Sequence, residues 1–320
     1  MPSRARTEQR VRREPCGRRT PGSAAAGDAA SVRQNGATPS RAFRGSDAVR
    51  DGALGRWELG GPAYPRLLHA VYAPAGLVRD HALVCEAAGL VLPASAQLTG
   101  ASAATVLGHD WLRRTDDVEV VMPDGVQHPA RGGVRLRRAR HPLDPGRPWR
   151  TTQLASPERV AFDAAARVPL ARAVARLDAL ARRGDLDLEE LGRWLHGRRD
   201  HGVTRVRRAL SLVDARAESL PESELRVLLV EAGVPVAVQH VVRGAGGGFV
   251  ARVDLAVVAA KVAILYDGAW HALRQQLEKD RAQLNALHAA GWEAVHVTAA
   301  DLADPGRVVA LVRAAVARRA

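Results

Sequence analysis

Two aspartates lie in apolar, strand-like segments of the last third of the chain. Asp254 interrupts the apolar run 249–257, and Asp267 ends the run 262–267. A carboxylate in an apolar strand is costly unless it is paired or bound to a cation. Residues two apart share a face of a strand, so Leu265 and Asp267 point to the same side. Two neighbouring strands thus present acids near one another, which is how proteins hold a hard cation such as Mg²⁺.

A cation held in this way suits the hydrolysis of a phosphodiester bond. It would stabilise the charge that develops on the phosphate and lower the pKa of an attacking water. Asp254 and Asp267 are therefore the first candidate ligands. Asp267 and the glycine that follows it could also form a simple turn.

Glu222 is the third candidate carboxylate. On its expected helix it lies in line with Leu225 and Leu229, on the core side. A carboxylate on such a seam fits a metal site. The segment from Ser219 to Glu222 also has the spacing of a capping box, in which the acid only closes the start of the helix. Both interpretations stay open.

Asp280 and His271 complete the polar side chains of this region. Asp280 lies between Leu277 and Leu284 on the apolar seam of an expected helix, which favours an interior partner. His271 could donate a proton or polarise a water. It could equally be a solvated side chain at the start of that helix.

Helices and strands are expected to alternate after residue 217. The periodicity predicts a helix over 222–232, strands over 236–242, 249–257 and 262–267, a helix over 273–290, a strand over 293–298 and a helix over 305–318. The glycine-rich segment 244–248 joins two strands and lacks the Gly-Lys-Ser/Thr ending of a phosphate loop, so a hairpin turn is predicted. This order is the core of the restriction-endonuclease-like fold.

Five motifs in order carry a resemblance to one family. They are Arg252-Val253-Asp254-Leu255, Ile264-Leu265-Tyr266-Asp267-Gly268-Ala269-Trp270-His271, Lys279-Asp280-Arg281, Gly291-Trp292 and Val297-Thr298-Ala299-Ala300-Asp301. Over about residues 218–317 the chain resembles the very-short-patch-repair-like (Vsr-like) endonuclease domain, known as domain-of-unknown-function family 559. The resemblance implies a PD-(D/E)XK-type core, Mg²⁺ or Mn²⁺ as cofactor and DNA as substrate.

The same resemblance assigns roles to individual residues. It implies that the catalytic site consists of Glu222, Asp254, Asp267, His271 and Asp280, and that the metal ligands are Asp254, Asp267 and the backbone carbonyl of Tyr266. The family usually has glutamate where this chain has Leu265. Mismatch-repair relatives tolerate an apolar residue there and use the carbonyl of the next residue. The nuclease could therefore be active with Tyr266 in that role, or it could be a degenerate domain that only binds DNA.

The middle of the chain, over 51–155, is predicted to be a mixed α/β region. Helices over 79–91 and 100–107 precede strands over 118–122 and 134–138. Between Arg131 and Arg150 there are seven arginines and one acid. Such a patch suits the DNA backbone, which Arg135, Arg137, Arg138 and Arg140 would contact. A solvated hairpin is the alternative.

Residues 156–217 are predicted to be a helical connector. A long helical pattern opens at Ser156-Pro157 and continues to about Arg183, followed by helices over 185–196 and 203–215. The segments Leu67–Tyr72, Leu98–Ala104 and Ser156–Arg159 resemble the abortive-infection type IV (AbiEi-like) antitoxin family. The winged helix that begins that family is truncated or missing here. The resemblance implies an antitoxin-like regulator, with a toxin or defence-system partner that the sequence does not identify.

The charge and composition set the remaining limits. The formal net charge is +13, which favours a polyanionic partner such as nucleic acid. Residues 1–50 contain eleven arginines, four acids and almost no large apolar side chains, so they are predicted to be a disordered basic tail, either a DNA-binding arm or a segment without a role. Two cysteines make neither a disulfide framework nor a zinc site.

Neither a signal peptide nor a membrane span is expected, which predicts a soluble cytoplasmic protein. Two functions remain in view. The first is a Mg²⁺-dependent DNA endonuclease or nicking enzyme, in DNA repair or in defence against phages and mobile elements. The second is a non-enzymatic, antitoxin-like DNA-binding regulator whose nuclease domain is degenerate. Retained acids favour the first, and Leu265 favours the second.

Overall fold

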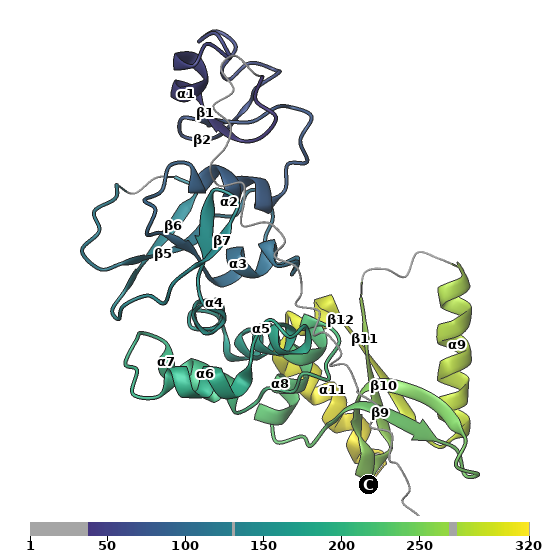
Figure 1. The fold of residues 1–320 in the computed structure, drawn as a ribbon. Coiled ribbons are helices and arrows are strands. Elements are labelled where there is room, and N and C mark those ends of the chain that lie inside the picture. The colour runs from purple at the N-terminus through teal and green to yellow at the C-terminus, as the bar shows by residue number, and fades with distance from the viewer. Residues whose placement is uncertain (1–37, 130–131, 269–273, 320) are drawn as a thin grey trace, which may run out of the picture. The chain divides into compact units, whose positions relative to one another are not determined.

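Figure 1 shows the fold in a computed structural model. The structure describes residues 38–129, 132–268 and 274–319, with side chains from residue 281 onward in the last range. Helices alternate with strands, and the strands of the described residues form three sheets. The expected mixed α+β class is confirmed. Among the described helices, none has both the length and the apolar character needed to cross a membrane.

A small three-stranded sheet begins the described chain. It consists of β1 (Phe43–Arg44), β2 (Arg66–Leu68) and β3 (Val71–Tyr72) in the order β1-β3-β2, with α1 at Gly45–Arg50. Ala42 and Val71 are buried in one apolar cluster with Leu83 and Ala87. The predicted boundary of a disordered tail at residue 50 is therefore wrong, because residues 43–50 form a strand and a helix. Residues 1–37 of that predicted tail lie outside the described residues.

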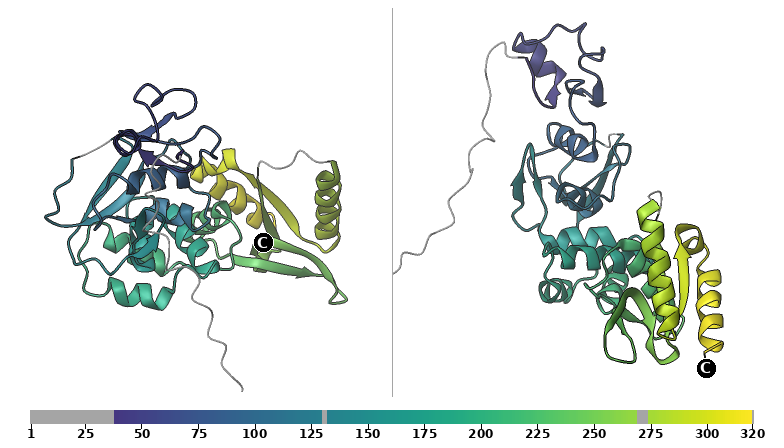
Figure 2. Two further views of the ribbon diagram at one scale, coloured as in Figure 1. Left: turned by 45° about the horizontal axis from the view of Figure 1, so that its top comes forward. Right: turned by 90° about the vertical axis from the view of Figure 1, so that its right-hand side faces the viewer.

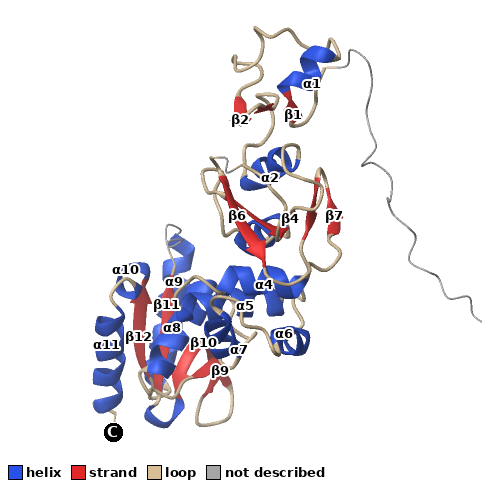
Figure 3. Ribbon diagram, turned by 90° about the vertical axis from the view of Figure 1, so that its left-hand side faces the viewer, coloured by secondary structure: helices blue, strands red, loops and turns tan. Residues whose placement is uncertain are grey.

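The middle sheet has five strands in the order β6-β5-β4-β8-β7 (Figure 3). The strands are β4 (Gln97–Leu98), β5 (Val118–Pro123), β6 (Val134–Ala139), β7 (Arg147–Trp149) and β8 (Thr152–Leu154), and the helices of this region are α2 (His81–Gly89) and α3 (Gly100–Val106). β5 and β6 run parallel, from Val118↔Val134 to Pro123↔Ala139. The alternative of a solvated hairpin is therefore wrong, and β6 forms one edge of the sheet.

Four helices follow the middle sheet. They are α4 (Pro157–Ala165), α5 (Leu170–Arg182), α6 (Leu188–Leu195) and α7 (Val203–Leu210), and they share one apolar cluster that includes Leu177, Leu191 and Val206. The predicted continuous helix from 156 to 183 is wrong. It is divided at Pro169, which lacks a backbone N–H and disfavours helical backbone in the residue before it.

The C-terminal sheet has four strands in the order β12-β11-β10-β9. Its elements are α8 (Leu220–Glu231), β9 (Ala237–Arg243), β10 (Phe249–Val257), the short helix η1 (Val258–Ala260), β11 (Val262–Asp267), α9 (Arg274–Ala289), β12 (Glu293–Thr298), α10 (Ala299–Leu302) and α11 (Pro305–Ala317). The predicted bounds of β10, β11 and β12 are confirmed to the residue. β9, β10 and β11 are antiparallel, and β11 and β12 are parallel.

Helices cover both faces of this sheet, as the right-hand view of Figure 2 shows. Leu255 and Ile264 pack with Leu225 of α8 and with Val312 of α11 on one face. Ala263 and Leu265 pack with Leu287 of α9 on the other. The alternation of side chains along β11 produces these two faces, because successive residues of a strand point to opposite sides.

Candidate functional site

Asp254 lies where the pairing between β10 and β11 stops. The antiparallel ladder of these strands ends at the pair Leu255↔Ile264. Just beyond that pair, the Asp254 carboxylate accepts a hydrogen bond from the backbone N–H of Tyr266 at 2.9 Å. A side chain thus supplies the acceptor for a strand amide that the ladder no longer pairs. This contact ties the carboxylate to the end of β11.

The surroundings of Asp254 disfavour its ionised form. The pKa of this carboxyl is raised to about 6; burial is the largest cause, and the nearby charges of Glu222 and Glu218 act in the same direction. The hydrogen bond from Tyr266 and the charge of Arg252 act in the opposite direction but do not cancel the rise. A carboxylate that is desolvated beside other acids gains most from a bound cation, since the cation would offset both effects.

Glu222 stands in the first turn of α8, where its carboxylate accepts from residues just before the helix but not from the Ser219 N–H that a full capping box would use. Its two carboxylate oxygens accept hydrogen bonds from Ser219 Oγ at 2.8 Å and from the Glu218 N–H at 3.0 Å. The side chain of Gln239 donates a further bond at 3.1 Å. The side chain of Ser219 in turn accepts from the Glu222 N–H. Glu222 therefore closes the helix and also adds negative potential at Asp254.

Asp267 is paired with a histidine of the neighbouring strand. His296 Nδ1 lies 2.9 and 3.1 Å from the two carboxylate oxygens of Asp267. β11 and β12 are parallel, with Leu265 opposite His296 and Asp267 opposite Thr298, so these side chains share the α9 face. The prediction that Leu265 and Asp267 face the same side agrees with this register. The carboxylate of Asp267 has His296 as its partner in the described structure.

The contact between Tyr266 and Asp254 is the hydrogen bond from the Tyr266 backbone N–H. A backbone carbonyl of this residue is the ligand that the family resemblance implies, and that role stays a prediction. Leu265 is partly buried in an apolar cluster with Val253 and Trp292. The position where the family usually has glutamate therefore lies beside packed apolar side chains on the α9 face.

Two of the five predicted catalytic residues cannot be placed by their side chains. His271 lies outside the described residues, and Asp280 lies on α9 in the part whose side chains are not described. Among the described side chains, no three of histidine, cysteine, aspartate and glutamate gather as a metal-binding group. The described donors near Asp254 are oxygens, which is the chemistry that Mg²⁺ or Mn²⁺ prefers. Asp254 and Glu222 fit such an ion in ligand type.

The four arginines predicted to contact DNA do not share one environment. Arg135 is 61% exposed, whereas Arg137 on the same strand is only 9% exposed and donates to Glu119 at 3.0 Å. Arg138 and Arg140 are exposed. Arg137 is therefore held in an internal ion pair, unlike the other three arginines, and the predicted contacts of all four with DNA stay a prediction.

No family model matches the chain. Two uncharacterized proteins of Mycobacterium tuberculosis, MT2308 of strain CDC 1551 / Oshkosh and Rv2248 of strain ATCC 25618 / H37Rv, are each 30% identical to it over 188 residues. Each match covers 57% of this chain and 65% of the relative's length. A crystal structure of the RV2827C protein from the same species shares 22% identity over 53% of this chain and 71% of that chain, with a TM-score of 0.37.

A buried polar cluster of the middle region is absent from the sequence-based predictions. Asp163 of α4 accepts hydrogen bonds from Arg159 Nε at 2.7 Å, from Arg159 Nη2 at 3.2 Å and from Thr99 Oγ1 at 2.8 Å. Arg159 and Asp163 are respectively 6% and 2% exposed in their side chains. Their spacing of four along a helix is visible in the sequence, but burial of that face is decided by packing against β4 and α3.

Glu119 of β5 extends this cluster. It accepts from the Ala101 N–H at 2.7 Å and from Arg137 at 3.0 Å. Gly100 has a φ of +56°, and a Cβ at this position would collide with the Glu119 carboxylate. Glycine thus allows the start of α3 to approach the acid closely. The segments 98–104 and 156–159, which carry the resemblance to AbiEi-like proteins, meet at this cluster.

Ser102 and His81 also form a close pair in this region. His81 Nε2 lies 2.8 Å from Ser102 Oγ, and burial lowers the pKa of the imidazole. Ser102 is fully buried and His81 is 1% exposed. A substrate cannot reach this hydroxyl, so we assign the pair to the internal structure of the middle region.

Proposed function

We propose that the C-terminal region is a Mg²⁺- or Mn²⁺-dependent DNA endonuclease or nicking enzyme with a restriction-endonuclease-like core. The observation that carries this proposal is the Asp254 carboxylate, which is largely buried, has acids nearby and stands at the end of the β10–β11 ladder. A buried acid without a cationic partner is expensive for a purely structural fold. A bound divalent cation would supply the missing positive charge and so explain why an acid is placed there.

Each residue near Asp254 would have a distinct role in binding the metal ion. Asp254 would be the principal ligand, and its bond from the Tyr266 N–H would hold the carboxylate in position. Glu222 would add negative potential from the start of α8. The bound ion would supply stabilisation of charge on the scissile phosphate and a lower pKa for an attacking water. His271 and Asp280 remain proposed members of this site.

Asp267 and His296 provide a group that can hold a proton. If Nδ1–H of His296 donates to Asp267, then Nε2 carries the lone pair and can accept a proton. A carboxylate that accepts from Nδ1–H in this way fixes the orientation and the tautomer of the imidazole. We therefore add His296 to His271 as a residue proposed to handle protons during hydrolysis.

Plasmid nicking by the purified full chain tests this proposal. We expect nicking with Mg²⁺ or Mn²⁺, none with a chelator, and a loss of about a hundredfold or more in Asp254→Asn, which keeps an acceptor for the Tyr266 N–H but removes the charge. Glu293→Gln is the matched control, since it removes an acid of the same domain whose ion-pair partner among the described side chains is Arg318. Nicking that survives in Asp254→Asn, or that needs no metal, would refute the proposal.

A second candidate is a DNA-binding, antitoxin-like regulator that does not cleave. Two observations favour it: Asp267 is paired with His296, and Leu265 packs among apolar side chains. Both leave fewer carboxylates available to bind a cation beside Asp254. Salt-dependent DNA binding without any metal-dependent nicking would support this candidate. A toxin or defence-system partner would then be the remaining component to identify.

A further inference from the structure

A hollow of about 290 Å³ lies in the middle region, away from Asp254. Its lining comes from β6 and the residue that follows it, from α4 and from the loop before α7. Six arginines line it: Arg135, Arg137, Arg138, Arg140, Arg159 and Arg167. The carboxylates among the lining residues are Asp163 and Asp200, so the lining has a formal excess of four positive charges. The volume is close to the roughly 300 Å³ at which small-ligand sites begin.

The two buried arginines form a fixed part of this lining. Arg159 makes two bonds to Asp163, and Arg137 makes one to Glu119. Both guanidinium groups are nine-tenths or more buried. Ion pairs with two buried acids therefore hold their positions before any ligand arrives, which lowers the entropic cost of binding.

One donor of Arg137 is left over. Its Nε–H is buried and has no hydrogen-bond acceptor among the described residues. The carboxylate of Asp163 lies 4.0 Å from this nitrogen, which is beyond hydrogen-bond distance. A buried donor without an acceptor is unfavourable, so an anionic oxygen in the hollow would gain a strong, charge-assisted bond there.

The exposed arginines of the lining are free to close on a ligand. Arg140 and Arg167 are exposed and form no ion pair with any described side chain. Arg135, in contrast, is paired with Asp117 and Glu119 at 3.6 and 3.8 Å, so Arg140 and Arg167 are the cations of the lining that we expect to close on a ligand. Asp200, the second acid of the lining, lies 3.6 Å from Arg198, a cation outside the lining that offsets part of its charge.

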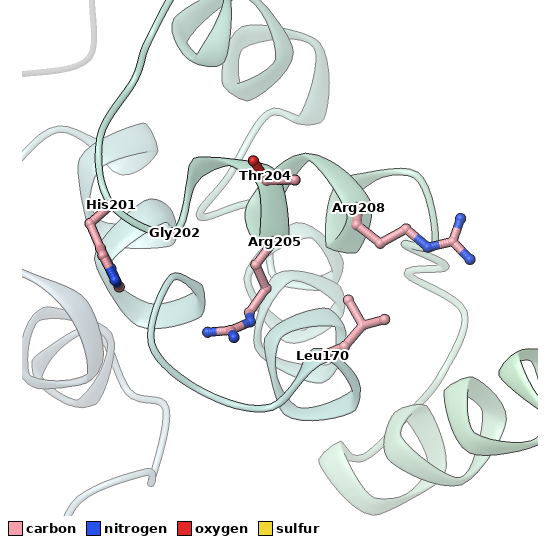
Figure 4. Close-up of a pocket in the computed structure, with 6 residues that line it drawn as sticks. All are labelled: Leu170, His201, Gly202, Thr204, Arg205 and Arg208. Carbon is pink, nitrogen blue, oxygen red and sulfur yellow. The ribbon is translucent and has the colours of Figure 1, made fainter.

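A second, shallower hollow of about 460 Å³ adjoins the first at His201 (Figure 4). Its cations are Arg205 and Arg208 of α7, and the aliphatic side chain of Leu170 lies beside them. Arg205 also donates to the carbonyl of Ala166, a residue that lines the first hollow. Arg208 is paired with Glu231 at 2.7 Å, so Arg205 is the cation that links the two hollows.

We propose that the hollow between β6 and α4 is a phosphate-binding pocket, in which Arg137 and Arg159 form the floor and Arg140 and Arg167 close the rim. Guanidinium groups match the geometry of phosphate oxygens through paired N–H donors, and a cluster of them selects phosphate over singly charged anions. The phosphate can belong to a free anion or nucleotide, or to a nucleic acid. The pocket does not depend on the proposed nuclease, since it contains neither Asp254 nor a metal.

Calorimetric titration of the full chain, in a chelator, tests this pocket. The probes are inorganic phosphate, a 5′-phosphorylated oligonucleotide and the same oligonucleotide without that phosphate. We expect inorganic phosphate to bind, and competition experiments with the two oligonucleotides then identify where the phosphate comes from. If only the phosphorylated oligonucleotide competes with inorganic phosphate, the pocket binds terminal phosphates. If both oligonucleotides compete equally, it binds backbone phosphates. If neither competes, it binds free anions.

The double variant Arg140→Gln/Arg167→Gln should weaken phosphate binding by about tenfold or more, because each charge-assisted bond contributes strongly. Arg193→Gln/Arg216→Gln removes the same charge from exposed ion pairs elsewhere and should change binding by less than about twofold. Asp254→Asn should bind phosphate like the parent chain, which separates this pocket from the nuclease. Absent phosphate binding, or equal weakening in both double variants, would overturn the proposal.

Discussion

Two carboxylates of this protein, one buried and one partly buried, have opposite surroundings. Asp163, in the middle region, receives two bonds from Arg159 and one from Thr99. Asp254, in the C-terminal sheet, receives one bond from a backbone amide and has two glutamates near it. The first charge is matched inside the fold, and the second is not. Internal pairing therefore explains Asp163 as a structural residue, whereas Asp254 calls for a partner from outside the chain.

The same contrast extends to the two proposed sites. In the middle region the acids serve to hold arginines, and the surplus positive charge faces a hollow. In the C-terminal region carboxylates lie near one another, and the described cation that affects Asp254 is the weakly contributing Arg252. The two proposals thus assign an anion to one region and a cation to the other, and substitutions in each region can test this division.

Of the substitutions considered, removing the charge of Asp163 should lower the stability of the protein the most. Asp163→Asn leaves the buried guanidinium of Arg159 without its counter-charge, which should lower the free energy of unfolding by roughly 3–5 kcal/mol. Urea unfolding of the full chain measures this loss. Glu190→Gln, which removes an exposed ion pair with Arg193, is the control and should cost less than about 1 kcal/mol. Similar losses in both variants would contradict the structural role of Asp163.

Introducing an acid at Leu265 should show whether a cation enters the C-terminal site. Without metal, Leu265→Glu places a carboxylate among packed apolar side chains and should destabilise the fold by roughly 3 kcal/mol. With Mg²⁺, stability should return and nicking should increase, because the residue would then act as a ligand. Adding Asp254→Ala should abolish both effects. An equal loss with and without Mg²⁺, with no nicking, would rule out the nuclease.

The ionised form of Asp254 should cost stability when no metal is present. Its folded pKa, about 6, lies above the ordinary value of 3.8, so the folded state binds the proton more tightly than the unfolded chain does. The free energy of unfolding contributed by this group therefore falls as pH rises from about 4 to about 6. Asp254→Asn should remove that slope and, above pH 6, stabilise the protein by about 2–3 kcal/mol.

Chemical denaturation of both proteins from pH 4 to 8, in a chelator, measures this difference. Comparison of the two curves removes the contributions of Asp178 and Glu224, whose pKa values are also raised by burial. A variant that is less stable than the parent above pH 6 would mean that Asp254 has a cationic partner within the fold.

The smallest effect concerns the salt dependence of DNA binding. The triple variant Arg135→Ala/Arg138→Ala/Arg140→Ala should reduce the slope of log affinity against log salt by about 0.9 for each phosphate that the variant no longer neutralises. Arg137 is left intact, because its replacement would unpair Glu119. A triple variant at Arg50, Arg193 and Arg216, which are exposed in ion pairs, is the control. An unchanged slope would remove β6 from the proposed DNA interface.

The C-terminal elements could be predicted from periodicity because each depends on local pattern. β10, β11 and β12 have the predicted bounds, and α9 begins and ends within one residue of its prediction. Apolar alternation and the glycine after α9 are signals within a few residues of each boundary. Pro169 is an equally local signal, and the continuous helix predicted across it is wrong because apolar periodicity on both sides does not restore the helix at a proline.

Side-chain partners in other strands could not be predicted in the same way. The pairing of Asp267 with His296 depends on the parallel register of β11 and β12, which are separated by a helix along the chain. The burial of Arg137 depends on the parallel order of β5 and β6, where the sequence also allowed a hairpin. Register between distant strands is set by the packing of whole faces, which a local window does not contain.

The sequence by itself determined the types of element, the basic charge and the apolar strand that contains Asp254. Tertiary structure decided which charges are matched: Asp163 meets Arg159 on one buried helix face, and Asp254 meets an amide where two strands stop pairing. The physical reason is that the energy of a charge depends on its solvation and on neighbours within a few ångströms. Those neighbours come from segments far apart in the chain, and folding alone brings them together.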